Sequence, residues 1–241
     1  MDVRGWLADS ATRVRADGLD GLRASARPVY HKALQGVTRL RDPGVSVYDR
    51  EWDLLVVVDA CRLDLMREVA PGYGFAGRVG AVRSLDSATL GWMRKTFAPA
   101  RADETAETAY VCGNPFSETA LDPADFGALD EVWRDVWTEP GTVAPRAITD
   151  RTVALARERD PDRLIAHYMQ PHCPFLSRPG LSRGKRRDRF GDQSWPDVWE
   201  RLRAGDLDPE TVWAGYRENL ALALDEVELL NEVTRLVETT D

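Results

Sequence analysis

Asp59 is the first residue whose type and position suggest chemistry, because it comes directly after a short apolar run. Residues 54–58 are five apolar residues in a row, three of them valines, and such a run is typical of a strand buried on both faces of a parallel sheet. Ligands of open α/β sheets collect outside the carboxyl ends of the strands, where Asp59 is expected. Asp59 therefore has two interpretations: a functional carboxylate at the sheet edge, or a cap of the helix that follows it.

Two serines belong to a hydroxyl-rich loop, residues 83–89, that opens a predicted helix. Ser84 or Ser87 suits the N-cap of that helix, and Asp86 or Ser87 suits its first turn. The N-terminus of a helix also favours a phosphate or sulfate ester, because its free N–H groups and its dipole attract an anion. Ser84 and Ser87 are then candidate nucleophiles if a metal ion lowers the pKa of the hydroxyl.

The elements that must position these residues alternate between strands and helices. The pattern predicts strands at residues 54–58, 77–82, 109–112 and 164–169, and helices at residues 62–69, 146–159 and 209–238, together with the helix that the hydroxyl-rich loop opens. The stretch 122–135 is partly polar, and no strand is predicted there. Alternating strands and helices indicate a mostly parallel sheet with helices on both faces, which is a three-layer α/β/α fold.

The N-terminal part is expected to be separate from this domain. Apolar residues at helical spacing predict a helical arm over residues 1–45, and residues 46–241 are expected to form the α/β domain. The arm is expected to lie against the domain, with contact to a membrane surface as the alternative.

A basic cluster lies in the least regular part of the sequence, residues 176–203. It contains Arg183, Lys185, Arg186, Arg187 and Arg189. Such a cluster is expected to be a solvated loop, and the alternative is a mobile substrate lid with an anion-binding patch.

Composition bounds the classes of protein to which the chain can belong. The 241 residues are 43% hydrophobic, enough for one α/β domain with a sizeable core. The net charge is −8, and lysine occurs only at positions 32, 95 and 185. An acidic, lysine-poor surface suits high salt and argues against nucleic-acid partners, which require a basic footprint.

Cysteine usage and hydropathy indicate the compartment. Cys61, Cys112 and Cys173 lie far apart without CxxC spacing, so the sequence predicts neither a zinc site nor a disulfide framework. Charged residues interrupt the N-terminal segment, so we expect neither a signal peptide nor a transmembrane segment. The expected location is cytoplasmic.

The order of these motifs resembles the alkaline phosphatase/sulfatase superfamily, and most closely its sulfatase-like branch in halophilic archaea. Residues 56–64, VVVDACRLD, are similar to the family's first strand with its metal-binding aspartate and Arg-x-Asp element. The resemblance implies Asp59 as a metal ligand and the hydroxyl-rich loop as the nucleophile loop, with Ser84 as nucleophile and Ser87 as the second candidate. Pro171-His172-Cys173-Pro174 is similar to the family's Pro-His-x-Pro element, which implies that His172 contacts the ester or its leaving group. His167 is expected to pack within its strand.

This resemblance covers about residues 52–241 and implies a hydrolase of phosphate or sulfate esters that uses a divalent metal ion, Zn²⁺, Mn²⁺, Mg²⁺ or Ca²⁺. The substrate is then a small-molecule or glycan ester, and a homodimer is left open. None of the cysteines has the Cys-x-Pro-x-Arg context of the formylglycine sulfatases, so a serine acting on a phosphate ester is as well supported as sulfate chemistry.

The second departure from the family concerns the metal. In the family the long helix leads into a strand that ends in Asp-His-Gly, and no Asp-His pair occurs in this sequence. A catalytic metal needs several protein ligands. The sequence is therefore expected to be either a fragment of a longer enzyme or a truncated paralogue, and the alternative function is a non-catalytic protein that binds an anion or a partner.

Overall fold

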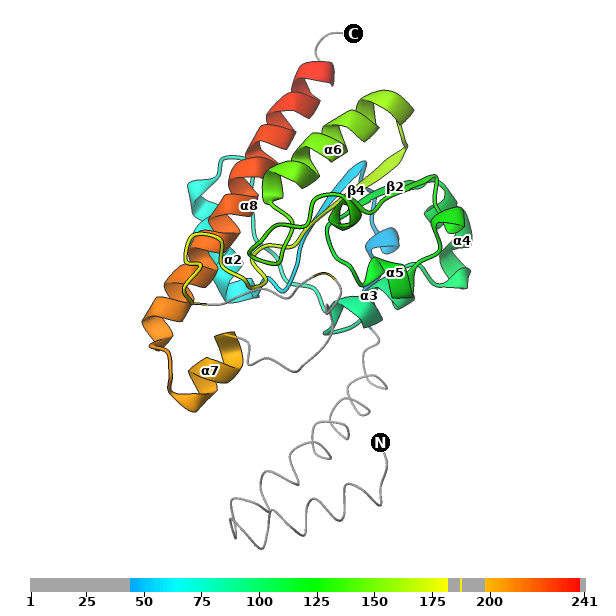
Figure 1. Ribbon diagram of the computed structural model, residues 1–241. Coiled ribbons are helices and arrows are strands. Elements are labelled where there is room, and N and C mark those ends of the chain that lie inside the picture. Colours follow the sequence, from blue (N-terminus) through cyan, green and yellow to red (C-terminus); the bar gives the residue numbers. More distant parts are fainter. Residues whose placement is uncertain (1–43, 182–186, 188–197, 239–241) are drawn as a thin grey trace, which may run out of the picture. The chain divides into compact units, whose positions relative to one another are not determined.

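The computed structural model describes residues 44–181, 187 and 198–238 of the chain, and for residues 233–238 it describes only the backbone (Figure 1). The chain divides into two units, and the second begins at Ser46. The helical arm expected over residues 1–45 lies outside the described residues, except for Gly44 and Val45. The basic cluster expected to form a loop or lid also lies outside them, except for Arg187.

The described part of the second unit contains one four-stranded, all-parallel sheet. Its strands are β1 (Leu54–Val58), β2 (Thr108–Cys112), β3 (Ala128–Asp130) and β4 (Arg163–Tyr168), in the order β1-β4-β2-β3. Val57 of β1 and Cys112 of β2 pair with the same residue of β4, His167. Because the three strands run in one direction, the residues that follow each of them meet at one edge of the sheet.

The helices occupy the sequence between the strands and after them. They are α2 (Leu63–Val69), α3 (Thr89–Thr96), α4 (Ala102–Ala106), α5 (Ser117–Ala120), α6 (Pro145–Arg159), α7 (Val198–Ala204) and α8 (Pro209–Glu238). The helices predicted near residues 62–69, 146–159 and 209–238 are confirmed. In Figure 1, α6 and α8 lie side by side along the sheet.

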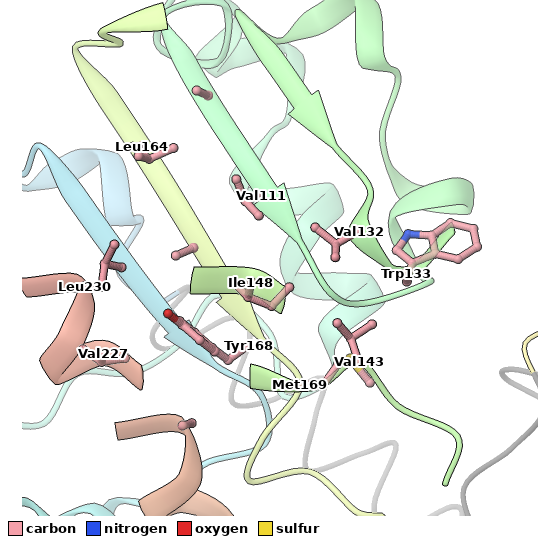
Figure 2. Close-up of a cluster of buried hydrophobic side chains, with 13 residues drawn as sticks. Val111, Val132, Trp133, Val143, Ile148, Leu164, Tyr168, Met169, Val227 and Leu230 are labelled. Atoms are coloured by element: carbon pink, nitrogen blue, oxygen red, sulfur yellow. The ribbon is translucent and has the colours of Figure 1, made fainter. Parts of the chain in front are cut away.

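One face of the sheet packs against α6 and α8 (Figure 2). Val111 and Leu164 of the sheet, Ile148 of α6 and Leu230 of α8 belong to a single apolar cluster there. Tyr168 is buried in this cluster, and its hydroxyl lies 3.0 Å from the hydroxyl of Thr149 on α6. The long helix thus buries the apolar stripe that its sequence spacing predicts.

The other face of the sheet packs against α3 and the segments near α5. Met93 of α3 is fully buried in a second apolar cluster with Tyr110, Cys112 and Ile165. Side chains alternate along a strand, so Tyr110 and Cys112 lie on this face whereas Val111 lies on the other. The sheet therefore has helices on both faces, and the α/β/α fold expected from the sequence is confirmed.

Three local expectations are wrong. All five residues of β1 are only partly buried, because β1 is an edge strand that pairs with β4 alone among the described residues. Residues 77–82 form no strand: most are exposed, and Val82 is 63% exposed, so no buried face favours a strand there. β3 was not predicted, because it is three residues long within a polar stretch.

Candidate functional site

One pocket lies at the carboxyl ends of β1 and β4, with a cavity volume of about 500 Å³. Asp59, Ser84, Ser87 and His172 all line it. These residues come from three separate segments: the end of β1, the loop before α3, and the loop after β4. The tertiary structure thus brings together the four site residues that the sequence predicted.

Asp59 is the most buried carboxylate of the pocket, with 7% of its surface exposed. Its backbone N–H donates a 3.0 Å hydrogen bond to the carbonyl of Tyr168, and the chain then leaves the sheet at Ala60 with a positive φ of 60°. Helix α2 has Arg62 at its N-cap position and no side-chain cap. The interpretation of Asp59 as a helix cap is therefore wrong, because its carboxylate points to other partners.

Thr89 is the first of these partners, and it was not among the residues predicted for the site. Thr89 begins α3, and its hydroxyl donates a 2.8 Å hydrogen bond to Oδ1 of Asp59. It also lines the pocket. The available sequence signal was its place as the last residue of the hydroxyl-rich loop.

Ser84 and Ser87 line the same pocket from more exposed positions. Neither caps α3, whose N-cap residue is Ala88 and which has no side-chain cap. The capping interpretation of the two serines is therefore wrong.

Asp86 holds the loop in place instead. Its carboxylate accepts hydrogen bonds from the N–H of Ala88 at 3.2 Å and from the Lys95 ammonium at 2.6 Å. These two partners lower the pKa of Asp86, the lysine contributing most. A Cβ on Gly91 would come within 2.5 Å of the Asp86 carboxyl carbon. Glycine at position 91 therefore lets the loop fold back on the first turn of α3.

Asn114 is the second partner of Asp59. It follows β2, is 1% exposed, and donates a 2.6 Å hydrogen bond from Nδ2 to Oδ2 of Asp59. Its Oδ1 accepts a 2.9 Å hydrogen bond from the N–H of Phe116, which fixes the orientation of the amide. Gly113 permits this arrangement, since a Cβ there would lie 3.0 Å from the carbonyl oxygen of His167. A polar residue two positions after a predicted strand was the available sequence signal.

His172 belongs to the loop that follows β4. Its backbone N–H lies 3.0 Å from the carbonyl of Asp59 and 3.0 Å from that of Met169. Its Nδ1 lies 2.6 Å from the carbonyl of Cys173, which leaves Nε2 for a ligand. Burial acts to lower the pKa of His172, but interactions with Cys173 and the charge of Asp59 outweigh it and raise the pKa to about 10. His172 is therefore an imidazolium at neutral pH.

Asn219 of α8 holds the loop that carries His172. Its side chain is fully buried, and Nδ2 donates to the carbonyls of His172 at 3.0 Å and of Pro171 at 3.3 Å. Its Oδ1 accepts a 3.0 Å hydrogen bond from the N–H of Leu176. The long helix thus positions the site as well as covering the sheet.

His167 also lines the pocket, although it was expected only to pack within its strand. It is fully buried in β4, and its Nδ1 lies 2.7 Å from the hydroxyl of Tyr110. Burial lowers the pKa of His167, and the charge of Asp59 acts in the opposite direction. His167 is therefore a neutral imidazole beside a site that also holds an imidazolium.

The expected divalent metal ion was tested against the side chains around Asp59. Catalytic metals are held by several protein ligands, usually three. Across the described ranges of the chain, no three His, Cys, Asp or Glu residues lie close enough together to hold a metal ion. Both oxygens of Asp59 instead accept hydrogen bonds from Thr89 and Asn114. These residues alone do not form a catalytic metal centre.

Comparisons with models of protein families, with curated proteins and with solved structures found no match for this chain. Among the helices that the structure describes, none has the length and apolar character needed to cross a membrane. The three cysteines are free thiols.

Proposed function

We propose that the pocket binds a phosphate or sulfate ester and that the chain is a hydrolase of such esters, of the alkaline phosphatase/sulfatase kind. The observation that carries the proposal is the 2.8 Å hydrogen bond from the Thr89 hydroxyl to Asp59, in a pocket that also contains His172. A hydroxyl paired with a base is an arrangement suited to nucleophilic catalysis.

The side chains of this pocket divide the reaction between them. Asp59 accepts the hydroxyl proton of Thr89 while Thr89 Oγ1 forms a bond to the phosphorus or sulfur atom. The bond from that atom to the leaving-group oxygen breaks, and this oxygen takes a proton from the His172 imidazolium. Water then hydrolyses the phospho- or sulfo-enzyme and releases Thr89. The positive charge of His172 also attracts the negatively charged ester group.

Thr89 replaces the two serines as our first candidate for the nucleophile. Its hydroxyl is the one that contacts the Asp59 carboxylate, whereas Ser84 and Ser87 lie further out in the pocket as exposed residues. Ser84 and Ser87 remain predictions, and they are also placed to bind the ester. A divalent metal ion remains a prediction too, and it requires ligands beyond those that the described residues bring together.

A second function is favoured by one observation, the incomplete metal-ligand set around Asp59. In this alternative the chain is a non-catalytic member of the superfamily that binds an anion or a partner in the same pocket. The ester would then be held by His172. Thr89 and Asn114 would fix Asp59 as part of the pocket wall.

The remaining expectations belong to the same proposal. The substrate is a small-molecule or glycan ester rather than a nucleic acid, because the acidic composition repels polyanions. Free thiols favour a reducing, cytoplasmic location. A homodimer remains open.

The test is hydrolysis of an aryl phosphate and an aryl sulfate by the purified chain in high salt. The protein is first treated with EDTA, and Zn²⁺, Mn²⁺, Mg²⁺ and Ca²⁺ are then added one at a time, with Asp59→Asn measured in parallel. Turnover that Asp59→Asn abolishes supports the hydrolase, and its dependence on added metal decides whether an ion takes part. Calorimetric binding of phosphate or sulfate without turnover supports the second function. A folded chain that shows neither overturns both.

A further inference from the structure

The ring of His167 is held in one orientation by the residues around it. It stacks parallel to the ring of Tyr110, with an interplanar angle of 6° and 6.1 Å between centroids. Trp92 of α3 packs against it edge to face at 6.0 Å. Nδ1 lies 2.7 Å from the Tyr110 hydroxyl, and a flipped ring would lose this bond. The other nitrogen, Nε2, is thereby fixed in position as well.

Nε2 of His167 is buried and has no hydrogen-bond partner among the described residues. An unsatisfied buried polar atom is unfavourable by the free energy of removing it from water, so native structures contain few of them. His167 lines the pocket that holds Asp59 and His172. Nε2 thus belongs to a residue that lines the pocket, and a ligand bound there is the candidate partner for it.

The Tyr110 hydroxyl is the partner that bears on the tautomer of His167. Tyr110 is fully buried, and burial raises the pKa of its phenol, which therefore keeps its proton. When this phenol donates to Nδ1 of His167, 2.7 Å away, Nδ1 is the acceptor. A neutral imidazole that accepts at Nδ1 carries its hydrogen on Nε2. In that tautomer the pair presents a hydrogen-bond donor at Nε2.

We propose that His167 is a second ligand-binding histidine, whose Nε2–H donates a hydrogen bond to an oxygen of the phosphate or sulfate group bound in the pocket. This inference rests on the proposed function. It extends that function by assigning a residue of β4 that binds the anionic group. Tyr110 acts as a positioning residue, because it sets the tautomer and contacts no ligand. His172 binds the same group from the loop that follows β4.

The first test observes the wild-type chain directly. Nitrogen-15 NMR of the imidazole rings is recorded at pH 7 with and without inorganic phosphate, and again with sulfate. We expect a neutral His167 with its hydrogen on Nε2, and a shift of the Nε2 resonance when the anion is added. A hydrogen on Nδ1, or an Nε2 resonance that does not respond to a bound anion, would overturn the inference.

The second test uses a matched pair of variants, with binding of inorganic phosphate measured by calorimetry. His167→Gln keeps an N–H donor near the position of Nε2, whereas His167→Leu removes the donor and keeps the bulk. We expect affinity at least about tenfold weaker in His167→Leu, the effect of one lost hydrogen bond to a charged group, and a smaller loss in His167→Gln. Tyr110→Phe should weaken binding less than His167→Leu and should change the tautomer ratio in the NMR spectrum.

The outcomes separate this inference from the proposed function. Wild-type chain that binds phosphate while His167→Leu binds it equally well overturns the role of His167 and leaves the proposed function standing. Wild-type chain that is folded but binds neither phosphate nor sulfate overturns both. If His167→Leu does not fold, the NMR measurement on the wild-type chain still decides the matter.

Discussion

Asn114 donates a 2.6 Å hydrogen bond to Asp59, although the two residues are 55 positions apart in the sequence. The bond joins the end of β2 to the end of β1, two strands that are not neighbours in the sheet because β4 lies between them. Both side chains are almost fully buried. The pair therefore depends on the order of the strands, and its strength can be measured.

We expect Asn114→Ala to destabilise the chain by about 2 kcal/mol, because it leaves a buried carboxylate oxygen without its donor. A double-mutant cycle with Asp59→Asn, followed by urea denaturation, gives the interaction energy of the pair. The expected coupling is about 1 to 3 kcal/mol, the range for a hydrogen bond to a charged group. Strictly additive effects would show that the two side chains do not interact.

Thr89 and Thr96 stand at the two ends of α3 and form a matched pair of hydroxyls. Thr89 donates to Asp59, whereas the buried hydroxyl of Thr96 has no partner among the described residues. We expect Thr89→Val to lower the rate of ester hydrolysis by about a hundredfold or more, the effect of losing a nucleophile. Thr96→Val should leave the rate unchanged and should be neutral or stabilising by up to about 1 kcal/mol.

The two serines provide the competing outcome for the nucleophile. Ser84→Ala and Ser87→Ala are measured in the same hydrolysis assay. If either abolishes turnover while Thr89→Val retains it, the nucleophile is that serine and Thr89 only orients Asp59.

Asn219 is predicted to matter for the site although it does not line the pocket. Asn219→Ala removes the hydrogen bonds that tie the loop around His172 to α8. We expect a loss of about 2 to 3 kcal/mol in the free energy of unfolding, since buried backbone groups lose their partners. Phosphate affinity should fall as well, because His172 is no longer held in place. Glu232→Ala, an exposed position on the same helix, is the control and should change neither quantity.

His172 predicts a pH dependence of stability. Its pKa is raised to about 10 in the folded chain, from an ordinary value near 6.5. A raised pKa means that the folded state binds the proton more tightly, so the stabilisation is fully present below about pH 6.5 and is lost as the pH rises to 10. Between these values the difference in unfolding free energy between wild type and His172→Gln should fall by up to about 1.4 kcal/mol per pH unit. Urea denaturation from pH 6 to 10.5 measures it, and a constant difference would contradict the prediction.

We expect the cysteine thiols to differ in their rate of reaction with iodoacetamide. Burial raises the pKa of Cys112 to about 12, with Asn114, Tyr110 and Ser117 acting in the opposite direction. Burial, and then the charge of Asp64, raise the pKa of Cys61 to about 11. Because the thiolate is the reactive form, native Cys112 should remain unlabelled at pH 8, and labelling of the partly exposed Cys61 should accelerate up to about pH 11. Mass spectrometry of digested protein gives both rates, and rapid labelling of native Cys112 would contradict its burial.

The sequence by itself determined those strands and helices whose apolar residues follow one regular spacing. The apolar run before Asp59 predicts β1, and the spacing of Val212, Tyr216, Leu220 and Leu224 predicts α8, because a buried face must repeat with the period of its element. The rule that ligands collect beyond the carboxyl ends of parallel strands was enough to select Asp59 as a candidate. The resemblance of Pro171-His172-Cys173-Pro174 to a family element selected His172. A three-residue strand such as β3 has too few residues to show a period.

The tertiary structure alone decided which side chains meet. Strand order placed Asn114 against Asp59 and brought His167 to the same pocket, and sequence spacing carries no information about that order. The direction of the chain before α3 decided that Thr89, rather than Ser84 or Ser87, contacts the carboxylate. Strand order also made β1 an edge strand, whereas the sequence indicated a strand buried on both faces. Local patterns specify local structure, whereas a site is built from contacts between residues far apart in the chain.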